Sequence, residues 1–134
     1  MKTMHRLALA AALFLTIGVA NADVVVVVSA KSPAAKLTKE QVADIFLGRA
    51  TNMVPLDQAA GSPVRDEFYS KVTGQTAAQV KTLWAKLSFS GKGTPPKALG
   101  GDDEVKAQLA ANPNAIAYMD KSKVDASVKI VLEP

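Results

Sequence analysis

The sequence DQAAGSPVRDEF fills residues 57–68, where an apolar, strand-like run ends and a helix is predicted to begin. Gly61 permits a tight turn, Ser62 is a favoured N-cap residue, and Pro63 suits the first helical position. We expect the start of this helix to point unpaired backbone N–H groups outward. Such an end carries roughly half a positive charge and can hold a small anion. Most capped helix starts bind nothing, so a purely structural role remains open.

The flanks of this stretch predict the elements that it joins. Residues 53–56 are short and apolar around Pro55, which indicates a strand whose proline lies at an edge or an end. Val64, Phe68 and Val72 follow at spacings of four, so we expect the helix to reach about Val72 with these side chains in the core.

Two further helices begin with capping boxes, in which a threonine is followed three residues later by a glutamine. They are predicted over residues 38–48, from Thr38 and Gln41, and over residues 76–87, from Thr76 and Gln79. Gly48 is expected to end the first in a left-handed conformation. Trp84 lies in the second and is interpreted as a core anchor.

The remaining apolar runs predict strands. Residues 24–28 are five consecutive valines, which favours a central strand covered on both faces. Residues 115–119 and 128–132 are predicted as two more strands, the last alternating so that Lys129 is exposed. Strands separated by helices indicate an α/β architecture, and the two final strands, with no helix between them, imply a mixed sheet.

Residues 88–101 are rich in glycine and proline and are predicted to form a loop. Lys92 and Lys97 lie on it and are candidate secondary contacts for an anion, although the glycine spacing is not that of a P-loop. Asp102 is expected to cap a helix through Ala111, and the acids of its first turn are interpreted as partners of the helix dipole.

The first 22 residues have the three parts of a secretory signal peptide: a positive start, an apolar run, and a small-x-small cleavage site ending at Ala22. We therefore expect an exported chain that begins at Asp23 and folds as one domain over residues 23–134. No cysteine follows the signal, so no lipid anchor is expected. After the signal, the sequence has no second long apolar segment that would predict a membrane span.

Composition excludes several functions. Removing Lys2 and Arg6 with the signal lowers the formal net charge from +4 to +2, and the remaining charges are interspersed, which argues against a nucleic-acid partner. The chain has no cysteine, and its sole histidine lies in the signal. We therefore expect no metal site, no cofactor and no catalysis by a serine or cysteine triad. No catalytic residue is predicted, and an enzyme is not expected.

Three segments together resemble one family: LTKEQVADIFLG at residues 37–48, the Gly61–Ser62 helix start with Phe68, and NPNAIAY at residues 112–118. They look like small single-domain relatives of the substrate-binding proteins of phosphate ABC transporters. The resemblance covers nearly all of residues 23–134. It implies a single lobe of a type II periplasmic binding protein-like fold, with a mixed sheet flanked by helices, and a periplasmic location.

The resemblance also implies a site for phosphate or a similar oxyanion. Gly61 and Ser62 match the phosphate loop of the family, whereas Pro63 and Val64 replace a glycine and a threonine that would donate to the ligand. Arg65 is a substitute cation inferred from proximity, and Gln58 is a candidate secondary contact. A single lobe leaves one side of a ligand wet, so we expect weak binding unless a homodimer or a partner supplies the opposite wall.

Two functions follow as expectations. The first is a substrate-binding module for phosphate or a similar oxyanion, linked to an ABC permease. The second is a non-catalytic periplasmic interaction protein that kept the fold, lost the ligand, and docks on another periplasmic or membrane protein through the loop at residues 91–101.

Overall fold

The valine-rich strand β1 (Val24–Ser29) lies inside the sheet of the computed structural model, which describes residues 23–134. Its five valines are at most 3% exposed, and alternate valines face two different hydrophobic clusters. The prediction of a central strand covered on both faces is therefore confirmed. The signal peptide predicted at residues 1–22 lies outside the described residues.

The sheet has five strands in the order β3-β2-β4-β1-β5. Strand β1 runs antiparallel to both of its neighbours, whereas β2 runs parallel to β3 and β4, so the predicted mixed sheet is confirmed. The other strands are β2 (Val54–Gln58), β3 (Lys97–Leu99), β4 (Ala115–Asp120) and β5 (Val128–Leu132).

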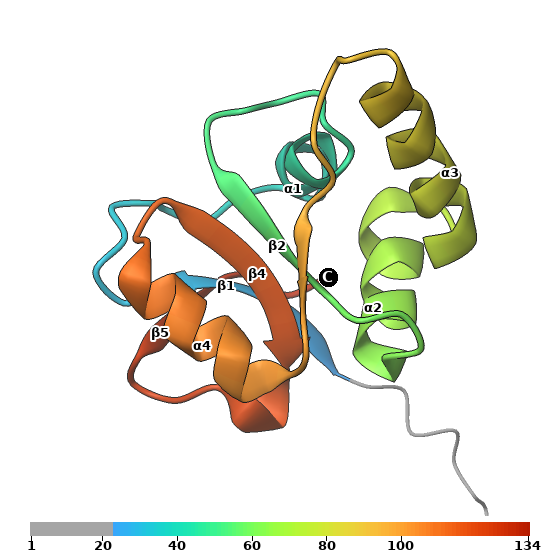
Figure 1. The fold of residues 1–134 in the computed structure, drawn as a ribbon. Helices are drawn as coiled ribbons and strands as arrows, with labels where there is room; N and C mark the ends of the chain where they lie inside the picture. Colours follow the sequence, from blue (N-terminus) through green and yellow to red (C-terminus); the bar gives the residue numbers. More distant parts are fainter. Residues whose placement is uncertain (1–22) are drawn as a thin grey trace, which may run out of the picture.

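Helices cover both faces of this sheet, as Figure 1 shows. The α-helices are α1 (Lys39–Phe46), α2 (Pro63–Phe68), α3 (Ala77–Phe89) and α4 (Asp102–Ala111); a π-helical turn, η1 (Tyr69–Thr73), continues α2, and a 3₁₀ turn, η2 (Lys121–Lys123), follows β4. Phe46, Phe68 and Trp84 bring α1, α2 and α3 into one cluster, and Val105 and Leu109 bring α4 into the other. The predicted α/β architecture is present.

Both predicted capping boxes are present, with Thr38 and Gln41 at α1 and with Thr76 and Gln79 at α3. Gly48 follows α1 with φ of 78°, as predicted for a left-handed residue. The predicted boundaries of the elements differ most from the observed ones in the strands of the sheet. Strand β2 continues to Gln58, two residues beyond its predicted end, because Asp57 and Gln58 are both buried and pair with β3.

Three other predictions need correction. The loop predicted over residues 88–101 contains the short edge strand β3, and α3 continues to Phe89. Gly101, and not Asp102, is the N-cap of α4. Strand β5 does not alternate, because a register shift opposite Val26 and Val27 turns Val131 inward.

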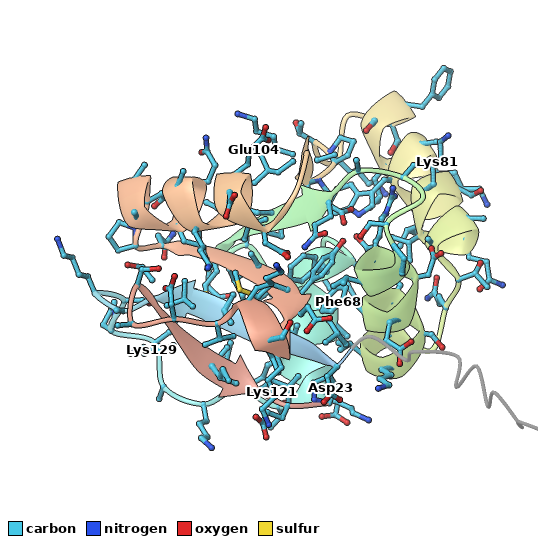
Figure 2. The ribbon with its side chains drawn as sticks, turned by 90° about the horizontal axis from the view of Figure 1, so that it is seen from below. Asp23, Phe68, Lys81, Glu104, Lys121 and Lys129 are labelled. Carbon is cyan, nitrogen blue, oxygen red and sulfur yellow. The ribbon has the colours of Figure 1, made fainter. Side chains whose placement is uncertain are left out.

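The parallel pairing of β2 with β4 places polar residues side by side at one edge of the sheet. Val54 pairs with Ala115 and Pro55 pairs with Ile116, so continuing this register brings Asp57 beside Tyr118. Figure 2 shows Phe68 between α2 and the sheet, close to this edge. Within residues 23–134, no helix is both long and apolar enough to cross a membrane.

Candidate functional site

The centre of this edge is the carboxylate of Asp57, which is 5% exposed and lies at the end of β2. Tyr118 donates its hydroxyl to Oδ1, and Tyr69 donates its hydroxyl to Oδ2 at 2.7 Å. The backbone N–H of Gln58 also donates to Oδ1, at 2.8 Å. A buried carboxylate is tolerated only when such donors replace its water, so this network satisfies Asp57.

The two phenols are held in their neutral, donating form. Burial raises the pKa of Tyr69 and of Tyr118 well above its ordinary value, and the nearby Asp57 carboxylate raises both pKa values further. Tyr118 also stacks on Phe68, with ring centroids 4.1 Å apart and planes 8° from parallel. The hydroxyls are therefore fixed by packing as well as by hydrogen bonds.

Gln58 ties the same edge to two helices. Its side-chain Nε2 donates to the carbonyl of Tyr118 at 3.0 Å and to Oδ1 of Asp102 at 3.2 Å. Its Oε1 accepts from the hydroxyl of Ser62 at 3.1 Å. Since Gln58 is 5% exposed, this predicted secondary contact lies within the protein, where it positions Ser62 and the start of α4.

Arg65 brings a positive charge to this network. Its Nε lies 3.7 Å from Oδ1 of Asp57, with the two side chains 13% and 8% exposed, and its guanidinium lies over the ring of Tyr69 at 5.9 Å. Cation–π attraction and the carboxylate both hold the guanidinium in place. Its Nε nevertheless has no hydrogen-bond partner among the described residues.

The backbone at the start of α2 differs from the prediction. Gly61 has φ of 88° and forms the expected turn, and Ser62 is the N-cap, accepting from the N–H of Arg65 at 3.4 Å. The N–H groups of Arg65 and Asp66 also reach the carbonyl of Ser62, at 3.1 and 3.3 Å. The expectation of unpaired donors pointing outward is therefore wrong for these two N–H groups, because the tight first turn uses them internally, and Pro63 has no N–H to offer.

Arg65 faces a cavity of about 330 Å³ between α2, α3 and the chain leading into β3, which we call the Arg65 pocket. Lys81 of α3 adds a second cation to its wall, and Asp57 adds one carboxylate. Figure 2 shows Lys81 on α3, far from Lys129 on β5. The other lining residues are Val80, Trp84, Ala85, Pro95, Pro96 and Ala98.

The two lysines predicted as secondary contacts lie elsewhere. Lys92 lines a separate cavity of about 210 Å³, beside Gly93 and Thr94, which shares only Trp84 with the Arg65 pocket. Lys97 is exposed on the edge strand β3. Of the predicted site residues, the structure brings together Gln58, Ser62 and Arg65 and places Lys92 and Lys97 outside the Arg65 pocket.

Four residues of the site were not predicted from the sequence: Asp57, Tyr69, Lys81 and Tyr118. Asp57 carried a usable signal, because an acid directly after an apolar strand and before a helix start lies at the edge where ligands of α/β folds bind. The two tyrosines carried no such signal, since their meeting depends on the pairing of β2 with β4, which is not a local property.

No protein-family model and no curated protein sequence matches this chain. Solved structures do match its fold, over 81% of the chain in each case. An ABC-type phosphate transport receptor from Vibrio cholerae has a TM-score of 0.64 at 20% identity. A phosphate ABC transporter substrate-binding protein from Clostridium perfringens, solved with bound phosphate, has a TM-score of 0.65 at 25% identity. PstS from Borrelia burgdorferi has a TM-score of 0.60 at 12% identity.

The matched region is 45%, 44% and 46% of those three proteins, so the chain spans less than half of their length. The α/β fold with its five-stranded mixed sheet matches one lobe of the binding proteins of phosphate ABC transporters. The resemblance noted from three sequence segments is confirmed at the level of fold.

Proposed function

We propose that this protein is a substrate-binding module for phosphate or a similar oxyanion, with Arg65 as the residue that holds the ligand. One observation carries the proposal: Arg65, whose Nε lies 3.7 Å from Asp57 without a hydrogen bond, and Lys81 line the same cavity. A guanidinium binds a planar pair of oxyanion oxygens through parallel hydrogen bonds. The protein from Clostridium perfringens binds phosphate, which supports the same class of ligand here.

The charges of the cavities favour this location. The Arg65 pocket is lined by two cationic side chains and by only one carboxylate. By contrast, Asp102, Asp103 and Glu104 line the cavity of about 360 Å³ at the start of α4, together with Lys123. That cavity repels an anion. Gly61 and Ser62 shape the turn that carries Arg65 to its position, and we assign them a supporting role.

Export and delivery complete the proposal. A signal peptide cleaved after Ala22 would release the protein into the periplasm, where an ABC permease would receive the ligand. The fold carries no catalytic role in this proposal. The matching proteins from Vibrio cholerae and Clostridium perfringens are described as a transport receptor and a substrate-binding protein, which supports a non-enzymatic module.

Calorimetric titration of the purified protein with inorganic phosphate tests the proposal. We expect binding in the millimolar range, which corresponds to about −4 kcal/mol, because one lobe leaves part of the ligand in water. Arg65→Gln should abolish the heat of binding. The matched control is Arg49→Gln, which removes the other arginine of residues 23–134, 62% exposed and paired with Asp44. Equal binding by both variants would overturn the assignment of Arg65.

A second candidate function is docking on another protein, and the exposure of Phe89 favours it. This side chain is 97% exposed at the end of α3, next to the loop at residues 91–101. Residues 75–101 hold four lysines and no acid, so an acidic partner surface would fit them. Exposed aromatic residues are common anchors of interfaces.

Photo-crosslinking in cells distinguishes this candidate from the first. A photoreactive residue at position 89 should capture one defined protein, whereas the same residue at position 78, exposed on the first turn of α3, should not. Reversing the charges of Lys92 and Lys97 should remove the adduct. An adduct that survives charge reversal would contradict a charge-guided partner.

A further inference from the structure

The Arg65 pocket combines a few charged side chains with a larger apolar lining. Its charged residues are Arg65, Lys81 and Asp57, which we call its charged end, and its apolar residues are Val80, Trp84, Ala85, Pro95, Pro96 and Ala98. The indole N–H of Trp84 already donates to the carbonyl of Phe46 at 3.0 Å, so it offers no donor to a ligand. Trp84 therefore presents only carbon to the pocket, and the neighbouring alanine and proline side chains do the same.

The volume of the pocket exceeds what inorganic phosphate requires. A water molecule occupies ~30 Å³ in the liquid, so a cavity of about 330 Å³ has room for roughly ten waters. A phosphate ion at Arg65 would fill only the charged end. The apolar wall would stay wet, and the favourable burial of that surface would not be gained.

The charged end is already organised for an oxyanion. Asp57, at 3.7 Å, and the ring of Tyr69, at 5.9 Å, hold the guanidinium of Arg65, so little side-chain freedom is lost when a ligand binds. Lys81 is exposed and reaches the same pocket from α3. A ligand group that bridges the two cations places whatever it carries against Trp84.

We propose that the ligand of the Arg65 pocket is an organic oxyanion, a phosphate or carboxylate group that carries a compact apolar body, and not inorganic phosphate itself. This inference rests on the proposed function, because it names the ligand class of the same site. The oxyanion pairs with Arg65 and Lys81, and the apolar body packs on the carbon surface of Trp84.

Fluorescence of Trp84 provides a direct test, because it is the only tryptophan of the chain. The purified protein is titrated with inorganic phosphate, phenyl phosphate, benzoate, and benzyl alcohol, which has the ring without the charge. We expect phenyl phosphate and benzoate to shift the Trp84 emission and phenyl phosphate to bind about tenfold more tightly than phosphate, a difference of ~1.4 kcal/mol. Benzyl alcohol should not bind.

Substitutions that fill the apolar part of the Arg65 pocket measure how much that part contributes to ligand binding. Ala85→Leu, at an exposed pocket position of α3, should reduce phenyl phosphate binding to the level of phosphate. Ala78→Leu is the matched control, exposed on the same helix outside the pocket, and should leave the tenfold preference intact. Ala98→Leu fills the pocket from β3 and repeats the test. Lys81→Gln should weaken the binding of all three anions, whereas Lys86→Gln should leave their binding unchanged.

The outcomes separate this inference from the proposed function. Phosphate and phenyl phosphate binding equally would overturn the inference and leave the oxyanion site standing. Phenyl phosphate binding that survives both leucine variants would also overturn it, because the ring would lie elsewhere. Failure of every anion to bind would overturn both proposals. A preference for phenyl phosphate that is lost in Ala85→Leu and kept in Ala78→Leu would support it.

Discussion

At the scale of single residues, Asp57 decides how this site behaves, because a buried carboxylate must be satisfied by its neighbours. Tyr118→Phe removes one of the hydroxyl donors to Asp57 and keeps the ring that stacks on Phe68. We expect the free energy of unfolding to fall by about 1–3 kcal/mol, as measured by urea denaturation. Phe89→Leu, a change at a 97% exposed aromatic side chain, is the control and should have almost no effect.

The tyrosines also give the protein a defined sensitivity to alkaline pH. A tyrosine in the unfolded chain ionises near pH 10. In the folded protein, burial and Asp57 raise the pKa of Tyr69 and Tyr118 well above that value. The unfolded state therefore loses protons first, and stability is full below pH 10 and falls as pH rises above it, with a limiting slope of about 1.4 kcal/mol per pH unit for each tyrosine.

This pH dependence can be separated from that of the lysines, which titrate in the same range. Urea denaturation of the wild type and of Tyr118→Phe is compared between pH 9 and 11. Because both proteins have the same lysines, the difference reports Tyr118 alone, and the variant should lose stability less steeply. Parallel curves would contradict the raised pKa of Tyr118.

If Arg65 holds the ligand as proposed, the charge of Asp57 limits how strongly it attracts an anion. Asp57→Asn removes the negative charge 3.7 Å from the guanidinium and retains a polar side chain of similar size. We expect phosphate to bind several-fold more tightly, while the free energy of unfolding falls because the buried cation loses its partner. Calorimetry and urea denaturation measure the two effects. Asp44→Asn, which removes the surface partner of Arg49, should change neither.

At the scale of elements, the sequence predicted what depends on near neighbours. Thr38 with Gln41 and Thr76 with Gln79 form the expected capping boxes because each box involves residues three apart. Residues 97–99 gave no strand pattern, since they form β3 only by pairing with β2. The position of Val131 depends on a register shift against β1, and the contact of Tyr118 with Asp57 depends on strand pairing. These long-range contacts decide the site, so the site was only partly predictable.

Two glycines that end helical segments differ in what surrounds them. Gly48 and Gly74 both have positive φ, 78° and 69°, so an alanine at either position costs about 1–2 kcal/mol of backbone strain. At Gly74 a Cβ would meet no atom within 4 Å. At Gly48 it would lie 2.9 Å from a ring carbon of Trp84, whose indole is fixed by its hydrogen bond to Phe46.

The two substitutions should therefore differ clearly. Gly74→Ala should lower the free energy of unfolding by about 1–2 kcal/mol, and Gly48→Ala by about 2–5 kcal/mol, because overpacking adds to the strain. Thermal and urea denaturation measure both, and each variant serves as the control for the other. Equal losses would show that Trp84 yields to the added methyl group and is less firmly anchored than its contacts indicate.

At the scale of the whole molecule, the two hydrophobic clusters share one sheet. Alternate valines of β1 enter the cluster under α1, α2 and α3 and the cluster under α4, so the faces cannot move apart without disrupting β1. The described residues therefore form one layered α/β unit, and the matched region is less than half of each binding protein that matches it. A ligand bound in the Arg65 pocket as proposed would be held by one lobe, between helices and the edge strand β3.

This single-lobe architecture predicts that ligand binding changes the shape of the molecule very little. A two-lobed binding protein closes around its ligand by a hinge and becomes more compact. Residues 23–134 offer no second lobe to close, so the radius of gyration should stay near 13 Å, the value for a domain of about this size, when saturating phosphate is added. Small-angle X-ray scattering measures this directly, with the Arg65→Gln variant as the control that does not bind. An increase in radius and in apparent mass with phosphate, absent in Arg65→Gln, would contradict the prediction and identify a second copy of the chain as the missing wall of the site.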